Sequence, residues 1–287
     1  MSAVDQPLGI TEPGVYDLPV EAYHADPVDG GSLSCTSARR LIPPSCPAKY
    51  RWHTDHAGED HAPHFDMGSA AHKLVLGAGA EIVVVDADSW RTTAAREQRD
   101  AAYAAGRTPL LAADMTVVEA MADALRAHPI AGRMFLPGKG KPEQTLIWRD
   151  QRTGIMCRAL VDWLPNRGRV WPDYKTAVSA WPEDFRRPAD VYGYAQQAAW
   201  YLAGVRALGL GGDDAPFVFV VQEKEAPYLV SVIELDSESL RIGAQRNRQA
   251  LSIFQWCTET GHWPGYSDDV ALVSLPNYVL ATEGADQ

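Results

Sequence analysis

The sequence predicts an α/β (α+β) fold, because strand-like and helix-like segments alternate along most of the chain. Short apolar segments rich in Val, Ile and Leu are typical of buried strands, and they occur at 81–86, 216–223 and 228–235. Longer segments with apolar residues three or four positions apart are typical of helices, and they cover much of 89–135 and 237–260. Such a mixture is expected of a sheet covered by helices.

Length and composition are those of an ordinary globular protein. The 287 residues are 46% hydrophobic and 22% charged, enough for a sizeable core. The chain shows no internal repeat and no low-complexity linker, so one domain is the simplest organisation. We expect that domain to span 14–280, with a helical insertion at about 89–135 and flexible tails at 1–13 and 281–287.

Several classes of protein are disfavoured by the same composition. No apolar run approaches the ~20 residues of a membrane span, and the N-terminus lacks a signal-peptide pattern, so a cytoplasmic location is expected. The net charge of −11 argues against bulk nucleic-acid binding, although a local basic track or bound Mg²⁺ can overcome it. The four cysteines are far apart without a CxxC pair, which indicates reduced thiols and not an iron–sulfur cluster: Cys35, Cys46, Cys157 and Cys257.

The most informative stretch is 157–176, which reads as two short apolar strands joined by an Asn-Arg-Gly turn at 166–168. A hairpin centred there places Asp162 opposite Asp173, give or take one residue. Lys175 would share a face with Asp173, because side chains alternate along a strand. Facing carboxylates repel each other in a sheet, so this pair is best retained when a cation lies between them.

Four further polar residues flank that stretch. His72 lies one turn into a helix that begins with small residues, and a lone helical His is more often structural than functional. Gln197 and Tyr201 are four apart and share a helix face, which alone is typical of any amphipathic helix. Glu143 begins a predicted strand at 143–150. Histidines between 53 and 64 lie in a poorly patterned, loop-like segment, and we do not expect them to bind metal.

A basic and aromatic segment lies near the N-terminus. Arg39, Arg40, Lys49 and Arg51 alternate there with Tyr50 and Trp52. Two interpretations stay open. The segment is either a solvated helix face with aromatic anchors or a DNA-binding surface, where cations meet phosphates and rings stack on bases.

The motifs taken in order resemble the PD-(D/E)xK nuclease superfamily in its RecB-like branch. The matching elements are the Gly68–His72 helix, Asp162 on a strand, the Asp173–Lys175 triplet, and the Gln197–Tyr201 helix. Ala159 stands where the branch often has Gly. Over roughly 13–280 the chain is also similar to the RecE-type phage and prophage exonucleases, known as exonuclease VIII. The resemblance implies a restriction-endonuclease-like core, with a mixed central sheet flanked by helices.

The resemblance also implies the chemistry of a metal-dependent hydrolase. Asp162 and Asp173 would bind Mg²⁺, for which Mn²⁺ could substitute, with the backbone carbonyl of Tyr174 as a third ligand. His72 matches the residue that supplies a metal ligand in the family. Lys175 would orient or help deprotonate the attacking water.

Three other residues have less defined roles. Gln197 and Tyr201 would hold the scissile phosphate or support Lys175. Glu143 would be an outer carboxylate or a ligand through water, with an ordinary surface Glu as the alternative.

The implied activity is a Mg²⁺-dependent exodeoxyribonuclease that degrades double-stranded DNA from an end, in the 5′→3′ direction, to expose single strands for recombination. The implied partners are double-stranded DNA ends, a RecT-type single-strand annealing recombinase, and further copies of the chain in a homo-oligomeric ring, with a tetramer suspected. Three alternatives remain. They are a RecB-like nuclease on single-stranded or flap DNA, a DNA-end-binding module without turnover, and a metabolic metal-dependent hydrolase with a compact pocket.

Overall fold

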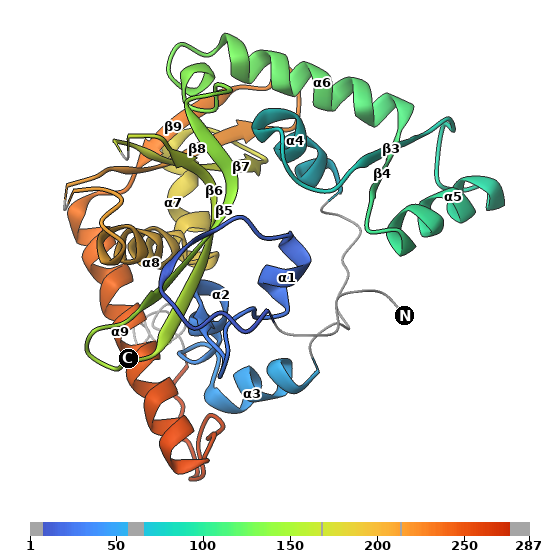
Figure 1. Ribbon diagram of the computed structural model, residues 1–287. Coiled ribbons are helices and arrows are strands. Elements are labelled where there is room, and N and C mark those ends of the chain that lie inside the picture. Colours follow the sequence, from blue (N-terminus) through green and yellow to red (C-terminus); the bar gives the residue numbers. More distant parts are fainter. Residues whose placement is uncertain (1–7, 57–65, 168, 213, 276–287) are drawn as a thin grey trace, which may run out of the picture.

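The computed structural model describes residues 8–56, 66–167, 169–212 and 214–275, and it has the expected mixed α/β architecture (Figure 1). One sheet has the strand order β1-β5-β6-β2. Its strands are β1 (Gly14–Tyr16), β2 (Leu33–Ser34), β5 (Gly140–Arg149) and β6 (Met156–Pro165). The long β5–β6 pair is antiparallel, whereas β2 joins β6 in parallel. The sheet is therefore mixed, as the fold prediction required.

A second sheet has the order β7-β8-β9, with strands β7 (Trp171–Ala177), β8 (Phe217–Glu223) and β9 (Val230–Glu234). β7 is parallel to β8, and β9 is antiparallel to it. Six of the seven residues of β8 are buried, which explains why its sequence is a continuous apolar run and does not alternate.

The hairpin expected at 157–176 is wrong in its backbone pairing. Among the described residues, β6 pairs with β5 and β2, while β7 pairs with β8. Two prolines account for this difference. Pro165 ends β6, and Pro172 has no N–H with which to extend a ladder toward β6. Trp171 instead donates its N–H to the Pro216 carbonyl, which turns the start of β7 toward β8.

Helices cover the sheets on two sides (Figure 1). The central helix α8 packs on β5 and β6 and is itself covered by α9. A second group packs around β7 and β8. The helices are α1 (Val20–His24), α2 (Cys35–Arg40), α3 (Pro47–Asp55), α4 (Asp66–Leu76), α5 (Thr93–Ala104), α6 (Ala112–Ala127), α7 (Pro182–Val191), α8 (Tyr194–Ala207) and α9 (Ser237–Thr260).

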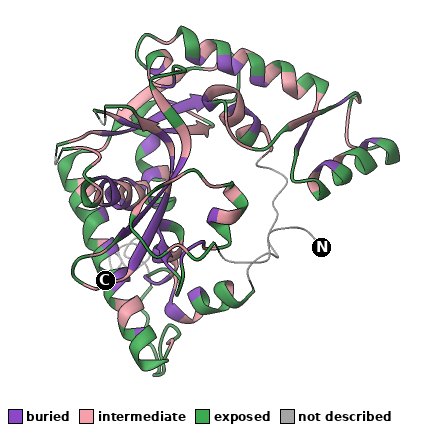
Figure 2. Cartoon of the chain, viewed as in Figure 1, coloured by how far each residue is buried: buried purple, intermediate pink, exposed green. Residues whose placement is uncertain are grey.

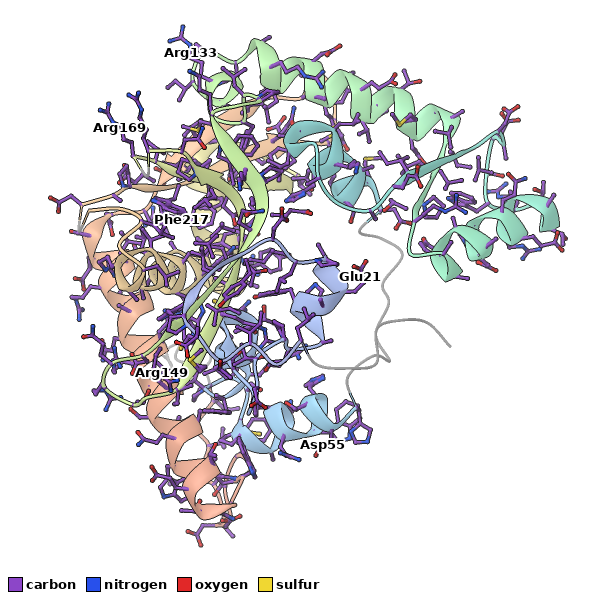
Figure 3. All side chains as sticks on the ribbon, in the orientation of Figure 1. Glu21, Asp55, Arg133, Arg149, Arg169 and Phe217 are labelled. Atoms are coloured by element: carbon purple, nitrogen blue, oxygen red, sulfur yellow. The ribbon has the colours of Figure 1, made fainter. Side chains whose placement is uncertain are left out.

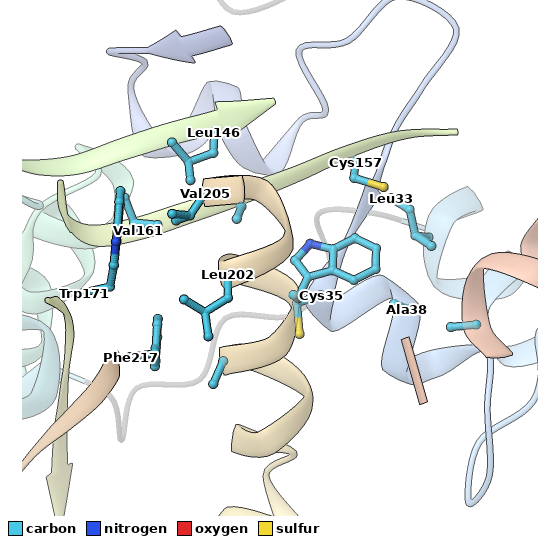
Figure 4. Packing of buried hydrophobic residues seen from close by; sticks show 14 of the residues in the cluster. Leu33, Cys35, Ala38, Leu146, Cys157, Val161, Trp171, Leu202, Val205 and Phe217 are labelled. Atoms are coloured by element: carbon cyan, nitrogen blue, oxygen red, sulfur yellow. The ribbon is translucent and has the colours of Figure 1, made fainter. Parts of the chain in front are cut away.

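The main core lies between α8 and the β5–β6 pair. Trp171, Trp200 and Phe219 are its largest fully buried side chains. Figure 4 shows Leu202 and Val205 of α8 reaching toward this core. The buried residues follow the central strands and the inner helices, whereas α5 and the outer side of α6 are mostly exposed (Figure 2).

The insertion at about 89–135 is largely helical but contains one strand. It comprises α5, α6, the 3₁₀ turn Ala131–Arg133, and β4 (Thr108–Leu111). β4 pairs in parallel with β3 (Ile82–Val85) to form a separate two-stranded sheet. Pro109 cannot continue a helix, and this is why the chain leaves the helical conformation there.

All four cysteines are buried and free, which confirms the expectation of reduced thiols. Within the described ranges, no helix is long and apolar enough to cross a membrane.

Candidate active site

Several of the predicted site residues border a large cleft formed by segments that are far apart in the sequence. The cleft has a volume of about 1240 Å³, and its walls include residues of α1, α4, β5 and β7. His72, Glu143 and Lys175 all line it. Its size is that of a site for an extended substrate, and its walls carry both carboxylates and cations.

Glu143 and Asp162 face each other across the β5–β6 pair. The ladder runs in register on both sides of them, through Pro142↔Trp163 and Gln144↔Val161. Glu143 itself has a φ of 46°, a left-handed conformation that is uncommon for a residue with a side chain. Residues held in such conformations cluster at functional sites, because the surrounding structure must offset the strain.

His72 lies between these two carboxylates. Its Nδ1 is 3.4 Å from Glu143 Oε1, and its Nε2 is 3.4 Å from Asp162 Oδ1. Burial lowers the pKa of His72, but the carboxylates of Asp162 and Glu143 more than offset this, so the pKa lies above its ordinary 6.5. Both ring nitrogens therefore face acidic oxygen atoms, which makes His72 part of one cluster with Glu143 and Asp162.

Two glycines allow the helix and loop around His72 to approach the strands. A Cβ at Gly68 would lie 3.2 Å from Thr176 Oγ1, at the end of β7. A Cβ at Gly79 would lie 3.3 Å from Glu143 Oε1, and the backbone of Gly79 has a φ of 108°. A glycine on each side of His72 in the sequence thus has a physical role in closing the site.

Asp162 also joins the two sheets. Its Oδ2 accepts a hydrogen bond of 2.7 Å from the backbone N–H of Tyr174 on β7. Burial raises the pKa of Asp162, but His72, Lys175 and this N–H together hold it below the ordinary value. A carboxylate takes the place of the missing backbone ladder between β6 and β7.

Asp173 and Lys175 form a buried ion pair on β7. The Nζ–Oδ2 distance is 2.5 Å, and the Asp173 side chain is only 2% exposed. Despite this short contact, Oδ2 accepts no hydrogen bond of acceptable geometry from the described residues. Burial, with a smaller contribution from the nearby Asp162, raises the pKa of Asp173 to about 7 although Lys175 opposes the shift. The neighbours of Asp173 therefore stabilise its charged form less than burial destabilises it.

Gln197 and Tyr201 of α8 differ in their distance from this pair. Gln197 Nε2 donates a 2.7 Å hydrogen bond to Asp173 Oδ1, so it positions that carboxylate directly. Tyr201 packs edge-on against Phe217, with ring centroids 5.7 Å apart, and burial raises its pKa well above 10. Tyr201 thus supports the packing beneath the site, whereas Gln197 touches a site residue.

Tyr194 is a further residue at the site, in addition to those predicted from the sequence. The Nζ of Lys175 lies 5.6 Å from the Tyr194 ring centroid, in a cation–π contact that restricts the lysine. The available signal was its position three residues before Gln197 on the same helix face. The carbonyl of Tyr174 stays a predicted ligand, while its hydroxyl donates to Gln222 Oε1 at 2.6 Å, away from the carboxylates.

The basic segment near the N-terminus does not line the cleft. Arg39 donates to the Val191 carbonyl, at the end of α7. Lys49 and Arg51 lie over aromatic rings of the C-terminal segment, and Arg51 also pairs with an acid one turn away. Arg40 is half-buried. Of the expected loop histidines, His53 lies in α3 and His56 directly follows it, and the others are outside the described residues: His61 and His64.

The donor set fits a divalent cation by its chemistry. Carboxylate oxygens are the ligands that Mg²⁺ prefers, and Asp173 Oδ2 is a buried oxygen atom without a hydrogen bond. The described His, Cys, Asp and Glu residues nevertheless include no group of three already arranged to hold a metal. In this conformation His72 and Lys175 contact the carboxylates that a cation would neutralise.

The order of elements, with opposed acids on β5–β6, an Asp-x-Lys strand and a helix that carries Gln197, defines a PD-(D/E)xK-type domain. A family model described as "PDDEXK-like domain of unknown function (DUF3799)" matches residues 34–276, and the chain belongs to this family. A solved structure of a candidate exonuclease from Eubacterium rectale is similar in fold, with a TM-score of 0.60 and 14% identity. The similarity covers 94% of this chain and 99% of that one. No curated protein matches the chain.

Proposed function

We propose that this protein is a metal-dependent deoxyribonuclease that hydrolyses phosphodiester bonds of double-stranded DNA from an end. One observation carries the proposal. Asp162, Asp173 and Lys175 lie close to His72 and Glu143, next to a large cleft that His72, Glu143 and Lys175 line, within a fold whose family is PDDEXK-like. Three acids, an imidazole and a buried lysine are the residues needed to bind a hard cation and to act on a phosphodiester.

The chain's own residues divide the work in this proposal. Asp162, Asp173 and His72 would hold the cation, with Glu143 and the Tyr174 carbonyl as additional donors. The bound cation would stabilise negative charge on the phosphoryl group and lower the pKa of a bound water. Gln197 keeps Asp173 in place through Oδ1 and leaves Oδ2 to face Lys175.

Lys175 has the position of a group that orients the attacking water and stabilises charge. Its ammonium is held between Asp173 and the Tyr194 ring, and burial lowers its pKa less than the two aspartates raise it, so it stays charged at neutral pH. A fixed cation in a partly buried site stabilises developing negative charge more strongly than one in water.

The size of the cleft favours a polymeric substrate over a small metabolite. A metabolic hydrolase of this type would have a compact pocket, whereas this cleft encloses about 1240 Å³. The two aspartates and the lysine of the motif, Asp162, Asp173 and Lys175, are all present. Their presence supports a catalytic nuclease over a module that binds DNA ends without turnover. The 5′→3′ direction, the role in recombination, Mg²⁺ as the metal, a ring-shaped homo-oligomer and an annealing partner are proposed from the resemblance to RecE-type exonucleases.

The test is incubation of the pure protein with linear and circular duplex DNA, with and without Mg²⁺. We expect degradation of linear DNA only, dependent on the metal, and its loss in Asp173→Asn. Asp123→Asn is the matched control, because Asp123 is an exposed acid on α6 outside the cleft. Equal cleavage of both DNA forms would refute the end-dependent activity. Full activity of Asp173→Asn would refute the assignment of the site.

A further inference from the structure

A second concave surface of the molecule is basic, although the protein as a whole is acidic. This groove has a volume of about 780 Å³ and is bordered by four cations, which are Arg133, Lys139, Arg167 and Arg169. They come from two segments about thirty residues apart in the sequence. Figure 3 shows Arg133 and Arg169 projecting from the same end of the molecule. None of the described residues that line the groove is acidic.

The four cations are exposed, and no described residue forms an ion pair or a side-chain hydrogen bond with them. By contrast, three exposed arginines on helices, Arg126, Arg186 and Arg241, each pair with an acid three residues away. In a chain with 37 acidic and 26 basic residues, a concave surface with only cations concentrates positive potential locally. Such a surface attracts a polyanion.

The groove is held in a fixed shape by hydrogen bonds between its two segments. Asn166 donates its side-chain amide to the Gly138 carbonyl and its backbone N–H to the Lys139 carbonyl, at 2.8 and 2.9 Å. Its floor is apolar and includes Met134, Leu136 and Pro165. A rim of cations around an apolar floor suits a single strand, whose phosphates meet the rim while its bases cover the floor. A duplex would keep its bases away from that floor.

The groove connects with the candidate active site along β5. Lys139 lines the groove, Lys141 lines the cleft, and Glu143 lies at the site. These residues are two positions apart, so the path from Lys139 to Glu143 is about 13 Å along an extended chain. We propose that the groove binds the phosphates of a single-stranded segment of the DNA substrate, an inference that rests on the proposed nuclease function.

The test compares two variants of the full chain that lose the same amount of charge. In the groove variant, Arg133, Lys139, Arg167 and Arg169 are replaced by Gln. In the control variant, the replaced residues are exposed arginines that line neither cavity: Arg149, Arg152, Arg206 and Arg241. Binding of a fluorescent single-stranded oligonucleotide is measured by anisotropy in EDTA over a series of salt concentrations, so that cleavage does not interfere.

We expect the groove variant to bind at least about tenfold more weakly at 0.1 M salt. The slope of log K against log salt should become shallower by about 3, because each phosphate contact on a single strand contributes about 0.7. The control variant should keep the wild-type slope. Equal losses in both variants, unchanged binding by the groove variant, or no binding by the wild-type protein would each overturn the proposal.

Cleavage measured in parallel separates this proposal from the proposed function. A wild-type protein that binds the strand through the groove but cleaves no DNA with Mg²⁺ would refute the nuclease assignment and support the groove. A wild-type protein that cleaves linear DNA, with a groove variant that binds as tightly as it does, would refute the groove alone.

Discussion

The buried carboxylate of Asp173 makes a quantitative prediction about stability and pH in the absence of metal. Its pKa is raised from 3.8 to about 7, with burial as the largest cause. The folded protein therefore binds a proton at Asp173 more tightly than the unfolded chain does. The stabilising contribution of Asp173 to the free energy of unfolding is fully present below about pH 4. This contribution falls as the pH rises through the interval from 4 to 7.

The magnitude follows from the size of the pKa shift. A shift of about three pKa units at 1.36 kcal/mol each corresponds to about 4 kcal/mol of stability lost between pH 4 and pH 8. Asp173→Asn removes this titration and keeps an oxygen that can accept the hydrogen bond from Gln197. We expect the Asn variant to match the wild-type protein near pH 4 and to exceed it by up to about 4 kcal/mol at pH 8.

The assay is denaturant unfolding of both proteins in EDTA across this pH range, with the difference in free energy of unfolding plotted against pH. The difference reports the charge of Asp173 together with its coupling to Lys175, Asp162 and His72. Mg²⁺ added at pH 8 should stabilise the wild-type protein more than the variant. A difference that does not change with pH, or one that favours the wild-type protein more as the pH rises, would refute the electrostatic description of the site.

Two further predictions concern neighbouring residues. Lys175→Met should reduce cleavage of linear DNA by about 10²- to 10³-fold, the usual effect of removing one fixed group that stabilises charge, while the circular dichroism spectrum stays native; a loss below threefold would exclude a catalytic role for Lys175. Tyr174→Phe leaves the buried Gln222 Oε1 without its donor, so the free energy of unfolding should fall by about 1–3 kcal/mol, as measured by urea titration. Unchanged stability of the Phe variant would show that another group satisfies Gln222.

Much of the candidate site could be predicted from spacing within single elements. Asp173 and Lys175 share a strand face, and Gln197 lies on the helix face next to them. Both placements were predictable, because the periodicity of a strand or a helix is a local property of its sequence. The strand at 143–150 was likewise predictable, but the left-handed conformation of Glu143 was not. That conformation depends on the cluster with His72 and Asp162, which only the folded chain brings together.

The errors in the sequence analysis came from contacts between distant segments. An antiparallel pairing of 157–164 with 169–176 was reasonable for two apolar strands with a turn between them. It failed because Pro172 has no N–H and because β8, about forty-five residues further on, pairs with β7 along its whole length. The DNA-binding role of the basic segment at 39–52, one of its two interpretations, stays a prediction. The basic groove was missed, because its cations come from two separate segments and no local pattern reveals it.

The hydrogen bond from the Tyr174 N–H to Asp162 has a mechanical consequence for the site. It is a direct link between the β5–β6 pair and the β7–β8 pair, and the same carboxylate faces His72. The boundary between the two sheets therefore runs through the candidate metal-binding residues. A substrate that wedges the sheets apart would separate Asp162 from Asp173, and one that presses them together would bring the two acids closer. Under the proposed function, the fit of a DNA strand in the cleft would set the spacing of the proposed cation ligands.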